Sequence, residues 1–437
     1  MSSGRTRTAT VTVTATIGSL APGGAGVTHV EQGGERRAVF VPQTAPGDRV
    51  RLEVDLSSRP ARGRVLDLLE TGADRVEPPC RWSAACGGCD WMHLAAHAQL
   101  REHAEQVRAV LPAAWRSIEI ATHPAPASLA YRTRARLHVR IGRGGHVVVG
   151  MNEAGTREPV EVGTCIVLDP ALEAIRAMLS GFFEGGSGRG DVQMALGRDR
   201  CPVLDVRWSG ELAPPAYGRF ERAVTQRIVA GVRVTEKDAT RPARIGDPTP
   251  WMAGADGEPL RLPPGGFGQA SEAANVALAR HTASTADALG QMGSLTTPIK
   301  AVELFAGAGN LSVLLARTAD LVCVESDREA CDAARENLGA RGLSARVTSA
   351  DAADYSWAPS TKLVVLDPPR TGARAVAERL AKTRVAHVIY VSCDAQTLGR
   401  DLAVLETSYT PESVATFEMF PQTSHVETVI ALARRRA

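Results

Sequence analysis

Cysteine and aromatic residues are scarce in this chain, which holds eight cysteines among 437 residues and only 4% Phe, Trp and Tyr. No apolar run approaches the roughly 20 residues that a membrane-spanning helix needs. The first residues, MSSGRTRTATVTV, are polar and lack the apolar segment of a secretory signal. These absences predict a cytoplasmic protein that contacts no membrane. The formal net charge of +2 favours no class of binding partner, so the partner has to be inferred from local clusters of charge.

The chain is long enough for two or three domains. In residues 5–69, short segments such as TATVTVTATIG and DRVRLEVD alternate apolar with polar side chains between Gly and Pro turns. Five such strands without a helix predict a small barrel of the OB type. A generic β domain and an RNA-binding barrel both fit this pattern.

Residues 70–265 are predicted to form a central α+β domain, and residues 93–115 within it are predicted to contain one helix that stops at Pro112. The pattern changes in residues 266–437, where buried strands alternate with helices, as in a doubly wound parallel sheet. Two apolar stretches around the turn PQTSH then predict a closing β-hairpin, as in class I methyltransferases.

The scarce cysteines are crowded in one place: PPCRWSAACGGCDW holds Cys80, Cys86 and Cys89. A reducing cytosol disfavours disulfides and favours metal ligation or reactive thiols. The spacing fits a zinc ribbon poorly, because it is no pair of Cys-x2-Cys motifs. A fourth ligand is available from Cys165 in VEVGTCIVL. Zinc and an iron–sulfur cluster both remain open.

A nucleoside site is predicted where VELFAGAGNLSVLLA reads as strand, glycine turn and helix. Gly307 and Gly309 allow close approach of the backbone to a ligand. Glu325 ends the next strand, where an acid can bind ribose hydroxyls, and Asp351 ends the third. The turn lacks the third glycine of the dinucleotide fingerprint. S-adenosylmethionine is therefore favoured over NAD.

Cys393 follows the strand VIYVS, at the edge where open α/β sheets bind ligands. A lone cysteine is usually a small core residue, but its polar neighbours favour a functional role. A thiolate beside a methyl donor suits methylation of uracil C5, which needs a nucleophile at C6 and a base for the C5 proton. Glu427 and the nearby His425 are the candidate bases.

The ordered motifs ELFAGAGN, DPPR, YVSC and MFPQTSHVET resemble the RNA uracil-5-methyltransferases. The front half resembles the branch with an N-terminal TRAM domain and a four-cysteine cluster, typified by an enzyme of large-subunit ribosomal RNA. The resemblance implies a class I methyltransferase domain behind an OB-like TRAM barrel and a central iron–sulfur domain. It also implies that the helix at 93–115 packs on the catalytic domain.

The resemblance further assigns roles to individual residues. It implies Cys393 as nucleophile and Glu427 as base. It implies a [4Fe–4S] cluster on Cys80, Cys86, Cys89 and Cys165. It places around S-adenosylmethionine the residues Gln269, Phe305, Asn310, Glu325, Asp351 and Asp367.

Ribosomal RNA is the expected substrate, with transfer RNA as the alternative, and a monomer is expected. A non-catalytic RNA-binding assembly factor is disfavoured by the presence of both Cys393 and Glu427. A redox iron–sulfur protein is disfavoured because the reaction is redox-neutral.

Four positions depart from the family pattern, which usually has Asn after the catalytic Cys and His-Thr-Gly in the hairpin. They are Asp394, Gln422, Ser424 and, in the Phe-x-Gln-x-Asn motif, Ser271. These departures leave the nucleophile and base intact and bear on substrate fit.

Residues 131–143, YRTRARLHVRIGR, carry five arginines and no acid. Arg132, Arg134 and Arg136 alternate and so share one face of a strand. They predict a basic stripe for RNA phosphates, and a merely solvated strand face is the alternative.

Overall fold

A computed structural model describes residues 10–32, 34–291 and 298–435. The chain divides into two compact units: Met1–Gln106 with Gln422–His425, and Val107–Pro421 with Val426–Ala437. Among the described residues, no helix combines the length and the apolar character required to span a bilayer. The predicted first domain began at residue 5, and residues 5–9 lie outside the described part.

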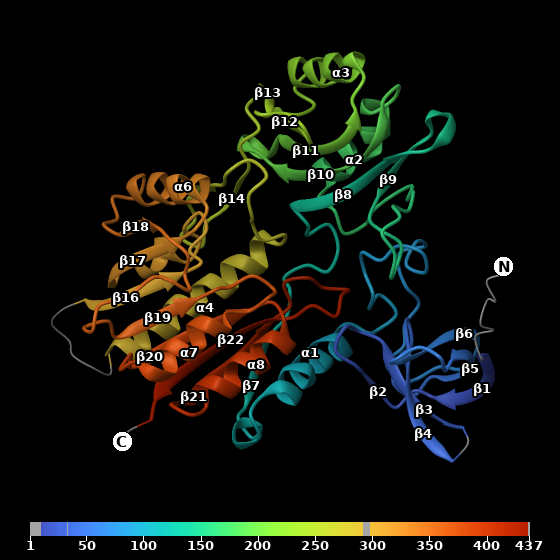
Figure 1. The fold of residues 1–437 in the computed structure, drawn as a ribbon, viewed down its shortest axis with the longest axis horizontal. Coiled ribbons are helices and arrows are strands. Elements are labelled where there is room, and N and C mark those ends of the chain that lie inside the picture. The colour runs from blue at the N-terminus through green and yellow to red at the C-terminus, as the bar shows by residue number, and fades with distance from the viewer. Residues whose placement is uncertain (1–9, 33, 292–297, 436–437) are drawn as a thin grey trace, which may run out of the picture. The chain divides into compact units, whose positions relative to one another are not determined.

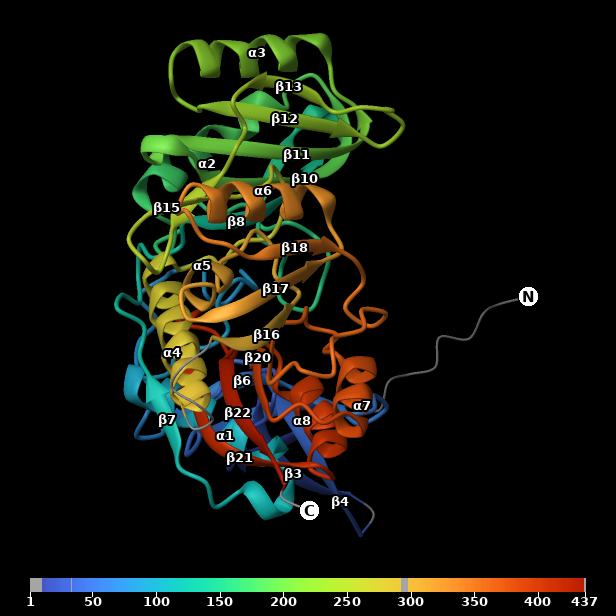
Figure 2. The ribbon, with the colours of Figure 1, turned by 90° about the vertical axis from the view of Figure 1, so that its left-hand side faces the viewer.

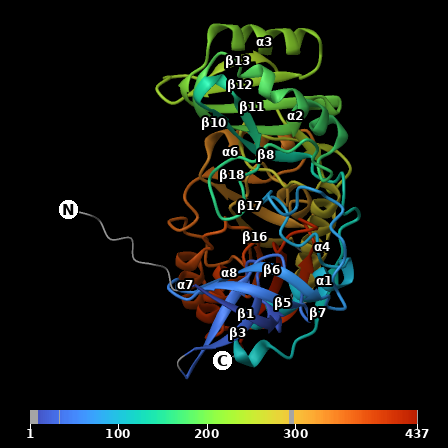
Figure 3. The same cartoon turned by 90° about the vertical axis from the view of Figure 1, so that its right-hand side faces the viewer.

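The first unit is built on a curled sheet (Figure 3). Its six described strands have the order β1-β5-β6-β4-β3-β2. The strands are β1 (Thr10–Thr16), β2 (Ser19–Leu20), β3 (Gly26–Gln32), β4 (Glu35–Val41), β5 (Arg49–Asp55) and β6 (Ala61–Glu70). The pattern of β5 alternates exposed and buried, and Val50, Leu52 and Val54 are fully buried. Five strands were predicted, and the structure describes six.

The cysteine-rich segment after β6 contains no described helix or strand and leads into helix α1 (Ala96–Val110). The sequence predicted a helix that stops at Pro112, and the helix ends two residues earlier, at Val110. Pro112 lacks an N–H and disfavours helical geometry at the residue before it. A single 3-10 turn, Ala113–Trp115, follows.

The second unit begins with a six-stranded sheet in the order β13-β12-β11-β10-β8-β9. Its strands are β8 (Arg134–Ile141), β9 (Val147–Gly150), β10 (Ser187–Leu196), β11 (Pro202–Glu211), β12 (Gly231–Glu236) and β13 (Ala243–Gly246). Helices α2 (Pro170–Phe182) and α3 (Pro214–Thr225) cover one face (Figure 2). Buried side chains such as Leu137, Val192 and Val206 point to that face, so the opposite face is polar.

A short ribbon, β14 (Trp251–Ala253) with β15 (Pro259–Arg261), leads to helix α4 (Glu272–Gln291). The chain then forms an eight-stranded sheet, counted over the described residues, in the order β18-β17-β16-β19-β20-β22-β21-β7 (Figure 1). Its strands are β7 (Ile120–His123), β16 (Ile299–Leu304), β17 (Ala319–Glu325), β18 (Arg346–Ser349), β19 (Leu363–Leu366), β20 (His387–Ser392), β21 (Tyr409–Phe417) and β22 (Glu427–Arg434).

The first five strands in this order, β18, β17, β16, β19 and β20, are parallel to one another. Strand β22 is antiparallel to both of its neighbours, β20 and β21. Four helices accompany them: α5 (Ser312–Leu315), α6 (Arg328–Gly339), α7 (Arg374–Lys382) and α8 (Ala395–Leu405). The predicted closing hairpin is confirmed as β21 and β22. The eighth strand, β7, comes from far earlier in the chain and pairs in parallel with β21.

Candidate active site

The turn after β16 carries residues that the sequence predicted to bind a nucleoside. Phe305, Gly307 and Gly309 have positive φ angles of 62°, 55° and 89°. A side chain at Gly307 would meet no atom within 4 Å, so this face of the turn is open. A non-glycine residue at positive φ is uncommon, and such residues cluster at functional sites.

Glu325 ends β17 beside this turn, and its carboxylate is fixed by two backbone groups. The N–H of Gly307 donates to Oε2 at 2.9 Å and that of Asp327 donates to Oε1 at 2.8 Å. Asp351, beyond the end of β18, is exposed and accepts a bond from the N–H of Ala353 at 2.8 Å. The carboxyl ends of parallel strands meet at one edge, so Glu325 and Asp351 lie at the same edge as the turn.

Asn310 at the end of the turn is held by helix α4. Its side-chain amide and that of Asn275, which is fully buried, donate to each other at 2.8 and 2.9 Å. Gln269 lies just before α4 and is 7% exposed. The amide pair therefore ties the glycine turn to the helix that follows Gln269.

Glu303 lies on β16 and is 2% exposed, yet the sequence did not single it out. Ser312 Oγ donates to its Oε2 at 2.5 Å. Burial, with the charges of Asp367 and Glu325, raises the pKa of Glu303 to about 8. A signal was present, since Glu303 is the lone acid inside a buried apolar strand.

Cys393 and Glu427 meet through strand register. Ser392 of β20 pairs with Thr428 of the antiparallel β22. Cys393 follows Ser392 and Glu427 precedes Thr428, so both residues lie at the same edge of the sheet. Glu427 is 2% exposed, and its Oε2 makes no hydrogen bond with the described residues. A buried acceptor without a donor is costly. This oxygen is therefore available to a proton or donor that enters the site.

The electrostatics of the site couple these groups. Burial raises the pKa of Glu427 to about 8, and the charge of Asp367 adds to it. Burial likewise raises the pKa of Asp367 to about 7 and that of Cys393 to about 12. Arg370, of the DPPR motif, opposes the rise in pKa at Cys393 and Glu427. A site crowded with acids favours a cationic ligand, whose charge would lower all three pKa values.

Two departures from the family pattern act as helix caps. The Asp394 side chain accepts from the N–H of Thr397 at 2.8 Å and caps α8. Ser271 Oγ accepts from the N–H of Ala274 at 3.3 Å at the start of α4. Asn, Asp and Ser are all good N-caps, so both substitutions are compatible with a capped helix.

The other two departures belong to the first unit, together with the cysteine segment and residues 96–106 of α1. Gln422 exchanges two hydrogen bonds with Gln99 of α1, at 2.9 and 3.1 Å. Ser424 donates through N–H and Oγ to the carboxylate of Asp90, at 2.8 and 2.6 Å. His425, the alternative base, is exposed.

All eight cysteines are free of disulfides. Cys80 and Cys89 line a cavity of about 300 Å³ in the first unit, and Cys86 lies between them in sequence. Cys165 belongs to the second unit, where it is half-buried. Among the described residues, no group of three His, Cys, Asp or Glu side chains is arranged to hold a metal ion. The chemistry of these thiols suits a thiolate-bound metal.

The predicted arginine stripe is only partly right. Arg132, Arg134 and Arg136 do alternate with buried residues. Arg134 is nevertheless not available, because its guanidinium is buried and donates to the carbonyl of Gly266. Its burial lowers the pKa to about 10. Arg132 stacks between Tyr131 and Phe420, 5.9 and 5.8 Å from the ring centres. The prediction was therefore wrong for Arg134, which holds a loop.

The strand order, the glycine turn after β16 and the antiparallel last strand β22 define a class I methyltransferase. A family model described as tRNA (Uracil-5-)-methyltransferase matches residues 344–435, and a methyltransferase small domain matches residues 288–389.

The 23S rRNA (uracil(1939)-C(5))-methyltransferase RlmD of Chromohalobacter salexigens is 31% identical, over 96% of this chain and 88% of the relative. An uncharacterized RNA methyltransferase of Caulobacter vibrioides is also 31% identical, over 96% of this chain and 99% of its own length. This chain therefore belongs to the RNA (uracil-C5)-methyltransferase family and is an enzyme of that class.

A solved structure supports the fold assignment. The complex of Pyrococcus abyssi tRNA (uracil-54, C5)-methyltransferase with S-adenosyl-L-homocysteine has a TM-score of 0.73 to this chain. The solved chain is 21% identical to this one, and the match covers 96% of this chain and 100% of the solved chain. At this identity the likeness shows the fold.

Proposed function

We propose that this enzyme transfers a methyl group from S-adenosylmethionine to C5 of a uridine in 23S ribosomal RNA. The observation that carries the proposal is that Cys393 and Glu427 lie at one edge of the sheet, next to the paired Ser392 and Thr428, where the charge of Glu427 acts on Cys393. One side chain supplies a nucleophile, and the other has an unpartnered buried oxygen and a pKa of about 8, suited to proton transfer near neutral pH.

In the proposed reaction, the Cys393 thiolate adds to C6 of the uracil, and the resulting enolate attacks the methyl group through C5. S-adenosylmethionine supplies that methyl group and a positive sulfonium charge. Glu427 then removes the C5 proton, and β-elimination restores the C5–C6 double bond and releases the thiolate. Arg370 favours both anions that these steps need.

The cofactor contacts follow from the same edge. We propose that Glu325 binds the ribose hydroxyls and Asp351 the adenine edge. Phe305, Asn310, Asp367 and Gln269 line the rest of the pocket. The fixed carboxylate of Glu325, held by Gly307 and Asp327, supports its part in this assignment.

Phe267 is proposed to stack on RNA. It is 77% exposed, in a chain with few aromatic residues, and it lies two positions before Gln269. The target uridine has to leave its stack to reach Cys393. An exposed ring beside the pocket suits contact with an unstacked base.

The cysteines are proposed to hold a [4Fe–4S] cluster through Cys80, Cys86, Cys89 and Cys165, with the first curled sheet acting as a TRAM-like RNA-binding domain. Four thiolates suit this cluster. Its role is structural, because methyl transfer is redox-neutral. We also propose that the protein is a monomer and is cytoplasmic.

Transfer RNA is the second candidate substrate, favoured by the description of the family model that matches residues 344–435. The 31% identical relative named for 23S rRNA favours ribosomal RNA. The deciding experiment maps 5-methyluridine in ribosomal and transfer RNA from a deletion strain, before and after complementation. Loss confined to transfer RNA would replace the ribosomal assignment, and loss from neither would refute the function.

A further inference from the structure

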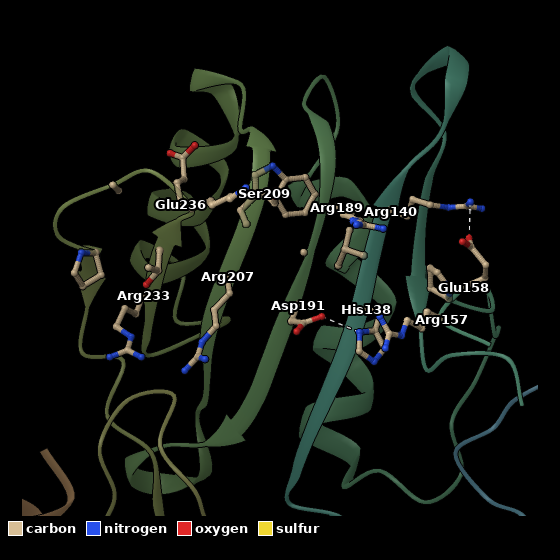
Figure 4. Close-up of a pocket in the computed structure, with 18 of the residues that line it drawn as sticks. His138, Arg140, Arg157, Glu158, Arg189, Asp191, Arg207, Ser209, Arg233 and Glu236 are labelled. Atoms are coloured by element: carbon tan, nitrogen blue, oxygen red, sulfur yellow. Dashed lines mark hydrogen bonds and ion pairs between the residues drawn. The ribbon is translucent and has the colours of Figure 1, made fainter. Parts of the chain in front are cut away.

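The polar face of the central sheet carries a groove that the proposed reaction does not use. Its volume is about 750 Å³, and Figure 4 shows its side chains rising from β8, β10, β11 and β12. We call it the basic groove. Its charged lining comprises Arg140, Arg157, Arg189, Arg207, Arg233 and Lys237 against the acids Glu158, Asp191, Glu236 and Glu329.

The four acids of the basic groove already have partners. Glu158 pairs with Arg140 at 2.5 Å, and Asp191 pairs with His138 at 2.7 Å (Figure 4). Glu236 accepts a hydrogen bond from the Tyr217 hydroxyl at 2.6 Å. The acid contributed by α6, Glu329, lies 3.5 Å from the Arg233 guanidinium.

The lining of the basic groove has six Arg and Lys side chains against four acids, and three of these cations have no acid partner in the described part of the chain. Arg157, Arg189 and Lys237 are exposed and form no ion pair with any residue that the structure describes. Arg189 also stands directly opposite Arg140 in the register of β10 and β8. Like charges in directly opposed positions destabilise a sheet. An anion bound between these strands would remove that cost.

The basic groove continues to the loop that carries Phe267. Gln193 Nε2 donates to the carbonyl of Gly266 at 3.1 Å, and Arg207 donates to that of Gly265 at 3.5 Å. Arg136, the exposed member of the predicted stripe, donates to Gln193 at 3.4 Å. One polar surface therefore joins the groove to the loop that precedes Gln269.

We infer that the basic groove binds the phosphate backbone of the RNA that flanks the target uridine. The inference rests on the proposed function, since it extends the path of the same RNA. Excess cations on a wide, open strand face suit a polyanion, and RNA phosphates are contacted in this way without readout of sequence. An RNA that extends beyond the target loop should then bind more tightly than the loop alone.

The test combines Arg157→Ala, Arg189→Ala and Lys237→Ala in one full-length variant. Its matched control is Arg222→Ala, Lys382→Ala and Arg384→Ala, which removes three exposed cations outside the groove. Binding to a long 23S rRNA fragment is measured from about 50 to 200 mM salt, the range over which phosphate contacts weaken strongly. The groove variant should bind about tenfold more weakly, and its log–log salt slope should fall by about two to three.

Kinetics separate the groove from the chemistry. On the long fragment the groove variant should show a raised KM with an unchanged kcat, while on a short oligonucleotide of the target loop it should match wild type. A groove variant that behaves like the control on long RNA would overturn the inference and leave methylation standing. Absence of methylation by the wild-type enzyme on either RNA would instead refute the proposed function.

Discussion

Asn275 and Asn310 exchange two hydrogen bonds between their side-chain amides, at 2.9 and 2.8 Å. Asn275 is buried in the first turns of α4, whereas Asn310 ends the glycine turn. This reciprocal pair fixes the orientation of the Asn310 amide. Under the proposed cofactor contacts, Asn275 is therefore a positioning residue for Asn310.

Replacing Asn275 with Ala should therefore weaken binding of S-adenosylhomocysteine by about tenfold, the effect of losing roughly one buried hydrogen bond of about 1.4 kcal/mol. Calorimetric titration of Asn275→Ala, Asn310→Ala and the double variant measures the coupling, which should reach about 0.5–3 kcal/mol for residues in contact. Exposed Gln226→Ala is the control. Strictly additive losses would show that the two amides act independently.

Stability should fall as pH rises, because buried carboxyls stay protonated in the folded chain. The pKa of Glu303 is about 8, above its ordinary value of 4.5, and burial is the main cause. Between those two values the unfolded chain loses this proton while the folded chain keeps it, so unfolding becomes more favourable with rising pH. Glu427 and Asp367 act in the same direction.

Glu303→Gln should keep the bond from Ser312 and remove that titration. We expect the variant to be more stable than wild type at pH 8 by an amount on the order of a few kcal/mol, and its Tm to depend less on pH between 5 and 8. Thermal denaturation over that range checks this, with exposed Glu119→Gln as control. An unchanged pH dependence would mean that Glu303 titrates normally.

The sequence predicted the catalytic half well, because its signals are local. Parallel buried strands with chemistry at their ends fix which residues share an edge, so Glu325 and Asp351 follow from pattern alone. Long-range contacts were out of reach: nothing local predicts that β7 pairs with β21, or that Gly266 captures the Arg134 guanidinium. The basic groove was missed for the same reason, since its cations come from separate strands.

The iron–sulfur proposal is testable by metal content. Protein purified without oxygen should be brown and hold about four irons per chain. Cys165→Ala should lose the iron and destabilise the protein, since metal binding is coupled to folding. Cys201→Ala serves as control, because that thiol contacts the carbonyl of Arg227 instead. Stoichiometric zinc without iron would replace the cluster with a zinc site.

Two substitutions separate the proposed roles of Cys393 as nucleophile and Glu427 as base. Cys393→Ala should abolish both methylation and any covalent RNA complex, because the adduct at C6 comes first. Glu427→Gln preserves the shape of the side chain but removes the base, so methyl transfer can proceed while elimination stalls. A methylated protein–RNA adduct should accumulate and survive denaturing electrophoresis. Loss of a general base typically costs about 10²–10⁴ in rate.

The pH profile gives this prediction a second, independent measurement. The pKa of Glu427 is about 8, so its basic form increases as pH rises towards that value. Wild-type turnover should therefore rise between pH 6 and about pH 8, and the residual turnover of Glu427→Gln should lack that rise if elimination limits the rate.

A 5-fluorouridine RNA should trap the wild-type enzyme, because C5 then carries no removable proton after methylation. Normal turnover by Glu427→Gln would transfer the role of base to another group, with His425 next to be tested. Methylation by Cys393→Ala would refute the covalent mechanism, because no other thiol lies on the strands that border Glu427.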